Sequence, residues 1–364
     1  VEDIRRIVRQ IGVNRLMDEV IARLTHACDT YDAAKACAPA RSGFEYQLPG
    51  IGLLEWMPVI EFGRRALIKV VGYHPANPSR RTLPTILSTA LTYDVETGHM
   101  LALMDGTFMT ALRTGAASAV ASRLLAPRQS RVLGLVGAGA QAIAQLHGLS
   151  RVLELERVLV FDADARVSAS FAERAALLGL DNIDIRVARL ETVVTSAHVL
   201  CTATSVDVGA GPVFEDSPLL HAGLHINAVG SDFPGKVEVP KSVLRRSLVC
   251  PDFLEQALRE GECQQIERGD VGPDLVTLVK RATEFEGYRD RPTVFDSTGW
   301  AFEDLVAADV LLGHGRDLGC GTEFVIESMS ADPRNPYAFA CDAASTEVSD
   351  SDHGRHRADT AASA

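Results

Sequence analysis

The clearest indication of fold class is the segment R-V-L-G-L-V-G-A-G-A-Q-A, which runs from Arg131 to Ala142. The apolar, β-branched run 132–136 is typical of a short buried strand, and a segment with helical spacing follows Ala142. Between them lies G-x-G-x-x-A, in which Gly137 permits a tight turn and Gly139 lets the main chain approach a pyrophosphate. The N-terminus of the helix then offers free N–H groups to phosphates. The stretch therefore predicts a dinucleotide-binding turn; the alternative is a plain βα turn with a structural glycine pair.

A second strand with an acid at its end favours the dinucleotide interpretation. Val158 to Phe161 form an apolar run that leads into Asp162, 25 residues after Gly137. An acid near this position typically hydrogen-bonds the ribose of the cofactor. No arginine follows Asp162 directly, and its carboxylate would repel a 2′-phosphate. The sequence therefore favours NAD over NADP.

Composition and charge limit the classes of partner. The chain has 364 residues, of which 46 % are hydrophobic and 23 % are charged, as is usual for a globular protein of about two domains. Its net charge of −12 argues against nucleic acid as a partner. No apolar run approaches the ~20 residues that span a bilayer, and the N-terminus does not resemble a signal peptide. Seven scattered cysteines without C-x-x-C spacing indicate reduced thiols. We therefore expect a cytoplasmic protein without a membrane partner.

The order of the expected elements predicts an α/β protein with two domains. Strands and helices, among them a helix over 165–178, alternate from residue 131 to 202; further strands are expected at 224–229, 248–250 and 294–295. This alternation predicts a Rossmann-type, doubly wound parallel sheet. The preceding part predicts an α+β domain, with helices within 1–35, strands at 50–54, 66–71, 85–92 and 100–104, and a helix over 107–125.

A last helix over 298–312, with Ser297 or Thr298 as its N-cap, is expected to lead the chain back to the first domain. We therefore expect the α+β domain to comprise residues 1–118 together with 305–341, and the dinucleotide-binding domain to comprise 119–304. Residues 342–364 contain almost no large apolar side chain and are expected to form a disordered tail.

Several spans together resemble the ornithine cyclodeaminase and mu-crystallin family across nearly all of residues 1–340. They are E-W-M-P at 55–58, G-Y-H-P-A-N at 72–77, A-L-R-T at 111–114, G-A-G-A-Q at 137–141, N-A-V-G-S-D at 227–232 and F-D-S-T-G at 295–299. Within the family, E-Q-A-L-R-E-G-E-C-Q-Q at 255–265 is most similar to the bacterial lysine cyclodeaminases. That branch implies supply of pipecolate to a secondary metabolite.

The resemblance implies an ammonia-lyase that uses NAD without net redox change. NAD takes hydride from Cα of a diamino acid, the distal amine closes the ring, ammonia leaves and the hydride returns to the cyclic imine. L-Lysine would give L-pipecolate, and L-ornithine would give L-proline. The resemblance further implies that NAD is held tightly, and that the first domain binds substrate and builds a homodimer or a larger homo-oligomer.

The same resemblance assigns roles to charged residues. Arg41, Lys69 and Arg113 fall where the family binds the substrate carboxylate. Lys69 also lies within the apolar run 66–71, where a buried lysine needs a partner. Asp232 would accept a proton from the distal ammonium, and Glu55 would bind an ammonium of the substrate. On the residues alone, surface arginines, a turn-capping Asp232 and a strand-face Glu55 paired with a cation are the alternatives.

The residues expected to contact the dinucleotide are Thr85, Arg113, Gly137, Gly139, Ala140, Gln141, Asp162, Thr204, Asn227, Ala228, Val229, Gly230, Lys236 and Ser297. The ten histidines show no H-E-x-x-H spacing, so no metal is expected. His74 is interpreted as a loop residue. The run Glu260-Gly261-Glu262-Cys263 receives no role.

Three alternatives to lysine cyclodeamination stay open. Ornithine differs from lysine by one methylene, which a pocket discriminates by only about 1–3 kcal/mol. A ketimine reductase or amino-acid dehydrogenase of the same fold would consume or produce NADH stoichiometrically. A non-catalytic NAD(P)H-binding protein of the mu-crystallin type is disfavoured by Asp232, because the resemblance implies that this branch lacks the acid.

Overall fold

The structure, a computed structural model, describes residues 1–341. Residues 1–320 form one compact unit, which contains every candidate site residue. The described part of a second unit, residues 321–341, ends in a short 3₁₀ helix, Ala338–Cys341. The expected tail, 342–364, lies outside the described residues, and the domain boundaries 118/119 and 304/305 stay a prediction.

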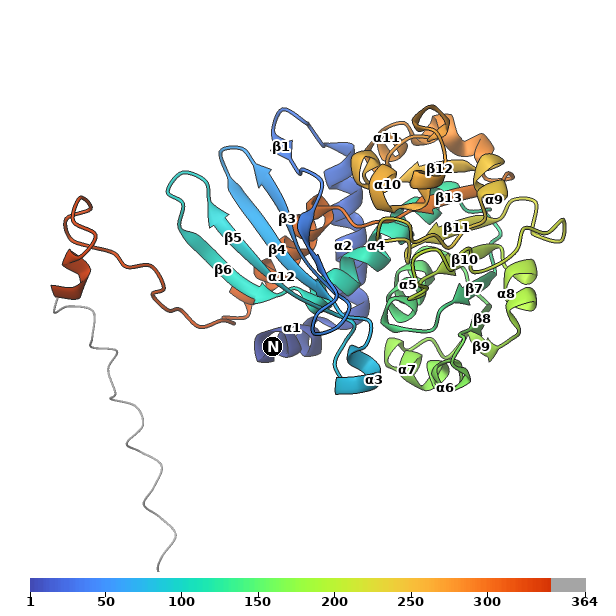
Figure 1. Ribbon diagram of the computed structural model, residues 1–364, viewed down its shortest axis with the longest axis horizontal. Coiled ribbons are helices and arrows are strands. Elements are labelled where there is room, and N and C mark those ends of the chain that lie inside the picture. Colours follow the sequence, from blue (N-terminus) through green and yellow to red (C-terminus); the bar gives the residue numbers. More distant parts are fainter. Residues whose placement is uncertain (342–364) are drawn as a thin grey trace, which may run out of the picture. The chain divides into compact units, whose positions relative to one another are not determined.

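An antiparallel sheet occupies the first part of the chain, as Figure 1 shows in blue and cyan. Its strands run in the order β1-β3-β4-β5-β6, and β2 pairs with β3. Side chains alternate between the faces of β3 and β4, so Glu55, Met57, Lys69 and Val71 are buried on one face. The strand bounds are β1 (Ala36–Cys37), β2 (Ser42–Tyr46), β3 (Gly52–Glu61), β4 (Arg65–Tyr73), β5 (Ile86–Asp94) and β6 (Met100–Asp105).

The second sheet is parallel and doubly wound, which confirms the predicted fold class. Its order is β12-β13-β11-β10-β7-β8-β9, so the direction of winding reverses between β7 and β10. In such sheets, ligands bind beyond the carboxyl ends of the strands at this switch point. The strands are β7 (Val132–Val136), β8 (Arg157–Phe161), β9 (Asp184–Val187), β10 (Val199–Thr202), β11 (His225–Ala228), β12 (Leu248–Pro251) and β13 (Thr293–Asp296).

Three long helices lie between the two sheets: α2 (Val13–Asp29), α4 (Thr107–Leu125) and α12 (Ala301–Asp317) (Figure 1). They share one apolar core with the buried face of the antiparallel sheet. The small residues of α4 allow close packing, since Gly115 lies against the main chain of Ala144 and Gly148 in α5 (Ala140–Ser150). Because α4 contacts both sheets, it fixes the candidate site between them.

Shorter helices complete the described fold: α1 (Glu2–Ile11), α3 (Asn77–Arg81), α6 (Ala165–Ala169), α7 (Phe171–Ala175), α8 (Leu190–Ser196), α9 (Lys241–Arg245), α10 (Leu254–Glu260) and α11 (Leu275–Lys280). Short 3₁₀ helices occur at 176–178, 262–265, 268–270 and 282–288. In residues 1–341, no helix combines the length and the apolar character that crossing a membrane requires.

Two sequence predictions are wrong in detail. The last helix begins at Ala301 with Trp300 as its N-cap, not at Ser297 or Thr298. Two features account for this: Gly299 has a φ of 94°, and the hydroxyl of Thr298 donates to Asp252, 46 residues away, instead of capping the helix. The predicted single helix 165–178 is interrupted at Ser170, between α6 and α7.

Candidate functional site

A cleft lined by charged and apolar side chains lies where the carboxyl ends of the parallel strands face the antiparallel sheet. It opens to solvent, and its empty volume of about 670 Å³ includes that open space. Eight of the predicted site residues line it together: Arg41, Glu55, Lys69, Arg113, Gln141, Val229, Asp232 and Ser297. Apolar side chains complete its wall, among them Leu53, Met57, Val71, Ile86 and Phe233. The cleft thus combines both signs of charge with an apolar wall.

The glycine turn has the geometry that the sequence predicts. Gly137 has a φ of 91°, and a Cβ on it would lie 2.5 Å from the carbonyl oxygen of Ala203, just beyond β10. Gly139 is the N-cap of α5 and would carry a Cβ in open space; no side chain of the described residues caps this helix. The first amides of α5 are therefore left for an external acceptor.

Asp162 follows β8 and closes the turn from the other side. Its carboxylate accepts hydrogen bonds from the main-chain N of Ala138 (2.8 Å) and of Asp164 (2.9 Å). The acid predicted to bind a ribose thus also shapes the glycine turn.

Lys69 and Arg113 are buried in ion pairs with α12. The Nζ of Lys69 lies 2.8 Å and 2.7 Å from the carboxylate oxygens of Asp304, and Lys69 is only 1 % exposed. Burial lowers the pKa of Lys69 to about 8 in spite of Asp304. The guanidinium of Arg113 pairs with Glu303 at 2.9 Å and with Asp304 at 3.0 Å. Both cations therefore face the cleft already balanced by acids.

Gly299 permits the close approach of Arg113 to the loop after β13. A Cβ on Gly299 would lie 2.8 Å from both terminal nitrogens of Arg113. Glu303 is buried beside the same guanidinium, and burial raises its pKa to about 8, although Arg113 opposes the shift.

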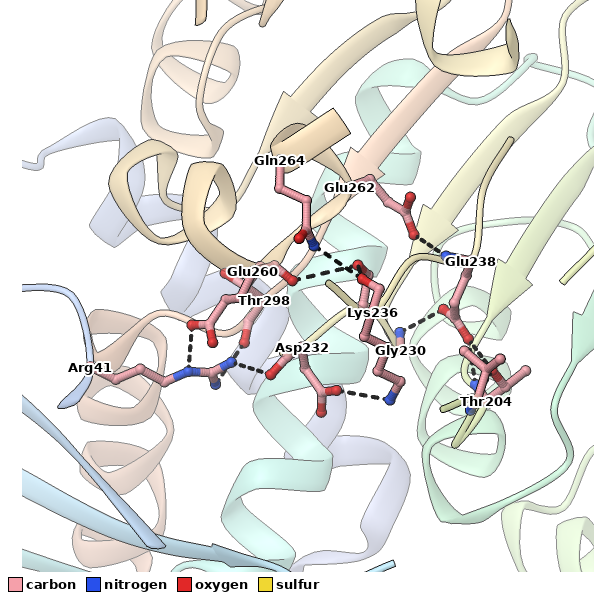
Figure 2. Close-up of polar contacts among 12 residues, drawn as sticks. Arg41, Thr204, Gly230, Asp232, Lys236, Glu238, Glu260, Glu262, Gln264 and Thr298 are labelled. Atoms are coloured by element: carbon pink, nitrogen blue, oxygen red, sulfur yellow. Dashed lines mark hydrogen bonds and ion pairs between the residues drawn. The ribbon is translucent and has the colours of Figure 1, made fainter. Parts of the chain in front are cut away.

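Arg41 connects the two sides of the cleft (Figure 2). Its Nε donates to Glu260 at 2.7 Å and lies 3.3 Å from Glu55. Its terminal nitrogens donate to the main-chain oxygens of Thr298 (3.1 Å) and Asp232 (2.9 Å). Burial raises the pKa of Glu55 against the opposing effect of Arg41. Glu55 therefore lies on a strand face and pairs with a cation, which was the alternative to its binding a substrate ammonium.

Asp232 is the most accessible acid of this group, with 27 % of its side chain exposed. Its Oδ1 accepts from the Nζ of Lys236 at 2.9 Å, and Lys236 also lies over the ring of Tyr73. Burial would lower the pKa of Lys236, but Asp232 and Tyr73 outweigh it and raise that pKa. Asp232 therefore has a fixed cation on one oxygen while its side chain reaches the cleft.

The remaining predicted residues lie outside the cleft lining. Thr204 and the amide of Gly230 are both held by the buried carboxylate of Glu238, at 2.6–2.8 Å. The side chain of Asn227 donates to Ser122 in α4 at 3.0 Å, and Ala228 is buried next to it in β11. Thr85 precedes β5, where its carbonyl oxygen accepts from the amide of His74. Ala140 starts α5 beside the glycine turn.

Sequence reasoning missed the acids that hold this site. Glu303 and Asp304 lie on a helix that had been identified only by its apolar positions, and Glu238 lies in a loop. The sequence pattern assigns no role to Glu260 and Glu262, yet both are almost fully buried. Charged residues next to apolar helix positions were the available signal, but their partners lie up to 235 residues away. Within residues 1–341, no cluster of His, Cys, Asp and Glu is suited to hold a metal ion.

A doubly wound parallel sheet with a glycine turn at its switch point, beside a cleft of buried acids and bases, defines a protein of the Rossmann class. Comparison with known proteins specifies the class further. Residues 2–315 match the ornithine cyclodeaminase/mu-crystallin family, and the chain belongs to that family.

Individual relatives cover nearly the whole chain. The L-lysine cyclodeaminase of Streptomyces rapamycinicus is 42 % identical over 93 % of this chain and 97 % of its own length. A solved lysine cyclodeaminase, studied for its recognition of L-lysine, L-ornithine and L-2,4-diaminobutyric acid, is 47 % identical with a TM-score of 0.90, covering 93 % of this chain and 97 % of its own. An archaeal alanine dehydrogenase dimer with bound NAD is 30 % identical with a TM-score of 0.78, covering 90 % and 98 %.

Proposed function

We propose that the protein is an NAD-dependent L-lysine cyclodeaminase, which converts L-lysine to L-pipecolate and ammonia. The main support is the composition of the cleft, which contains the cations Arg41, Lys69 and Arg113 together with the carboxylates Glu55 and Asp232. A diamino acid requires both signs of charge, one for its carboxylate and one for its ammonium groups. The similarity to lysine cyclodeaminases over more than nine-tenths of the chain supports the same conclusion.

The residues present fit NAD as cofactor. The uncapped amides of α5 suit a pyrophosphate, and Asp162 suits a ribose hydroxyl. The Oγ of Ser297 and the Oε1 of Gln141 are buried at the cleft, and neither has a hydrogen-bond partner among the described residues. Such unpaired polar atoms are costly to bury, so a bound polar group is expected there. When bound, NAD would supply a hydride acceptor for the substrate Cα and, once reduced, a hydride donor to the same carbon.

The protein side chains orient the substrate and move its protons. Lys69 and Arg113 attract the substrate carboxylate, while Asp304, which pairs with both, limits the excess of buried positive charge. Asp232 accepts a proton from the distal ammonium, and the Nζ of Lys236, which donates to its Oδ1 at 2.9 Å, holds the carboxylate in place for this step. The distal amine is then neutral and can attack the carbon that bears the α-nitrogen. Glu55 attracts an ammonium group of the substrate.

A net oxidoreductase is the second candidate function, because the archaeal alanine dehydrogenase shares the fold over nine-tenths of this chain. That activity would transfer electrons from an amino acid to NAD without ring closure. Ornithine is the second candidate substrate, since it differs from lysine by one methylene.

We further propose a homodimer assembled through the first domain. The antiparallel sheet exposes the apolar side chains of Leu87, Leu101 and Leu103 on β5 and β6. Exposed apolar patches on a sheet commonly mark an association surface. Light scattering coupled to gel filtration tests this: twice the chain mass is expected, and a monomer would contradict it.

A product assay tests the proposed function. The protein is incubated with excess L-lysine, or in parallel L-ornithine, and less than one equivalent of NAD. We expect pipecolate and ammonia in equal amounts, many turnovers per NAD, and slower formation of proline from ornithine. NADH that accumulates in step with amino-acid consumption would favour the dehydrogenase. A faster reaction with ornithine than with lysine would make ornithine the main substrate and lysine the second candidate.

A further inference from the structure

The run Glu260-Gly261-Glu262-Cys263 lies directly behind the cleft. Glu260 is the last residue of α10 and is 5 % exposed. It is not one of the residues that line the cleft. Its carboxylate binds the Nε of Arg41 at 2.7 Å, although the two residues are 219 positions apart. One turn earlier on α10, Gln256 accepts the main-chain amide of Arg41 at 2.8 Å. Helix α10 therefore holds Arg41 by both its main chain and its side chain.

The orientation of Arg41 determines what its far end contacts. With Nε directed at Glu260, one terminal nitrogen donates to the main-chain oxygen of Asp232 at 2.9 Å (Figure 2). The other reaches the main-chain oxygen of Thr298 at 3.1 Å. A guanidinium is planar and rigid, so rotating its Nε away from Glu260 moves both terminal nitrogens. The contact to Asp232 thus depends on the contact to Glu260.

The turn after α10 supports the loop 230–237, which contains Asp232, near the end of that loop. Gln264 accepts the amide of Gly235 at 2.7 Å and donates to the carbonyl of Lys236 at 3.0 Å (Figure 2). The hydroxyl of Ser231 also donates to Lys236 at 2.6 Å. The loop 230–237 is therefore fixed near its end by Gln264, while Arg41 supports it at Asp232.

We propose that Glu260 is a positioning residue, which holds Arg41 in the orientation in which Arg41 supports the main chain of Asp232. The inference rests on the proposed function only in taking Asp232 as the base; the arrangement of the three residues stands by itself. Without Glu260, Arg41 is left with Glu55, whose carboxylate is 3.3 Å from the same Nε. Arg41 then turns toward β3, and the carbonyl of Asp232 loses its donor.

The charge of Glu260 responds to pH near neutrality. The charged groups that face it are Arg41, Glu55 from β3, and Asp232 from the loop after β11. Burial raises its pKa to about 7, Arg41 opposes this, and the two neighbouring carboxylates add to it. Below pH 7 the protonated acid no longer forms an ion pair with Arg41, so proton transfer at Asp232 becomes less efficient.

Two substitutions of Glu260 and a matched control test the proposal in the full chain loaded with NAD. E260A removes the contact to Arg41, and E260Q keeps a neutral acceptor. E255Q changes an exposed glutamate of the same helix, which pairs with Arg268 at the surface. With L-lysine, we expect E260A to lower kcat at least tenfold with NAD affinity unchanged, and E260Q to recover part of that loss. The plot of kcat against pH for E260Q should also lack the ionisation near pH 7, whereas the plot for E255Q should match that of the wild type.

The failure of this proposal differs from the failure of the proposed function. If wild-type protein does not form pipecolate, the proposed function falls; crystal structures of wild type and E260A then decide the positioning role. Arg41 displaced from the carbonyl of Asp232 in E260A supports it. The positioning role is overturned if Arg41 has not moved in E260A. It is also overturned if E260A keeps the wild-type kcat and E260Q keeps the wild-type pH profile. Should E260A not fold, E260Q provides both the structure and the profile.

Discussion

A methyl group added at Gly137 should destabilise the protein itself. Gly137 has a φ of 91°, which costs an L-residue about 1–2 kcal/mol. The new Cβ would lie 2.5 Å from the carbonyl oxygen of Ala203, and such overpacking typically costs about 1–3 kcal/mol. Gly137→Ala is therefore expected to lose about 2–5 kcal/mol. At about 2 °C per kcal/mol for a chain of this size, melting falls by roughly 4–10 °C.

Gly139→Ala is the matched control, two residues away in the same turn. A Cβ on Gly139 meets no atom within 4 Å, and its φ of −76° suits any residue. Replacing glycine by alanine at an N-cap costs less than about 1 kcal/mol. The methyl would, however, occupy the space through which a pyrophosphate approaches α5. We expect this variant to fold normally and to bind NAD at least tenfold more weakly.

Thermal melting of cofactor-free protein, with and without NAD, separates the two effects. At 100 times its Kd, NAD should stabilise the wild type by about 2.7 kcal/mol. A tenfold weaker Gly139→Ala would lose about 1.4 kcal/mol of that gain. An unchanged melting temperature for Gly137→Ala would show that a Cβ at this position does not clash with the carbonyl oxygen of Ala203. Normal NAD stabilisation of Gly139→Ala would refute a pyrophosphate at the start of α5.

Three further outcomes are expected. Asp232→Asn should keep NAD affinity and lose on the order of 10²-fold in kcat, whereas near-normal turnover would remove Asp232 from the mechanism. Affinity for L-pipecolate should fall as pH rises above about 8, because burial lowers the pKa of Lys69 to about 8 and the neutral amine no longer attracts a carboxylate; calorimetry with a flat profile to pH 10 would contradict this. Asp162→Ala should weaken NAD binding and also lower the melting temperature, because the amides of Ala138 and Asp164 lose their acceptor; an unaltered NAD titration would show that another residue binds the ribose.

Sequence patterns predicted what is local. The turn at Gly137 follows from residues within one strand–turn–helix unit, and helix 107–125 coincides with α4. The periodicity of the apolar strands likewise placed Lys69 on a buried strand that needed a partner. These features depend on neighbours in the chain, which the sequence displays directly.

What the sequence could not predict is tertiary. The partner of Lys69 is Asp304, which lies 235 residues away on a helix identified by its apolar face alone. Glu260 became interpretable only once folding brought Arg41 to it. The N-cap at Trp300 was misplaced because Thr298 donates to Asp252 across the cleft loop, which overrides its local capping preference.

In the proposed cyclodeamination, hydride leaves the substrate Cα and returns to the same carbon while ammonia is lost. The most direct test follows L-lysine carrying deuterium at Cα, with less than one equivalent of NAD. Return of the same hydride should give pipecolate that retains the deuterium at its α-carbon, one ammonia per pipecolate, and no lasting NADH. Product that has exchanged the label with solvent, or NADH that rises in step with lysine consumption, would contradict it.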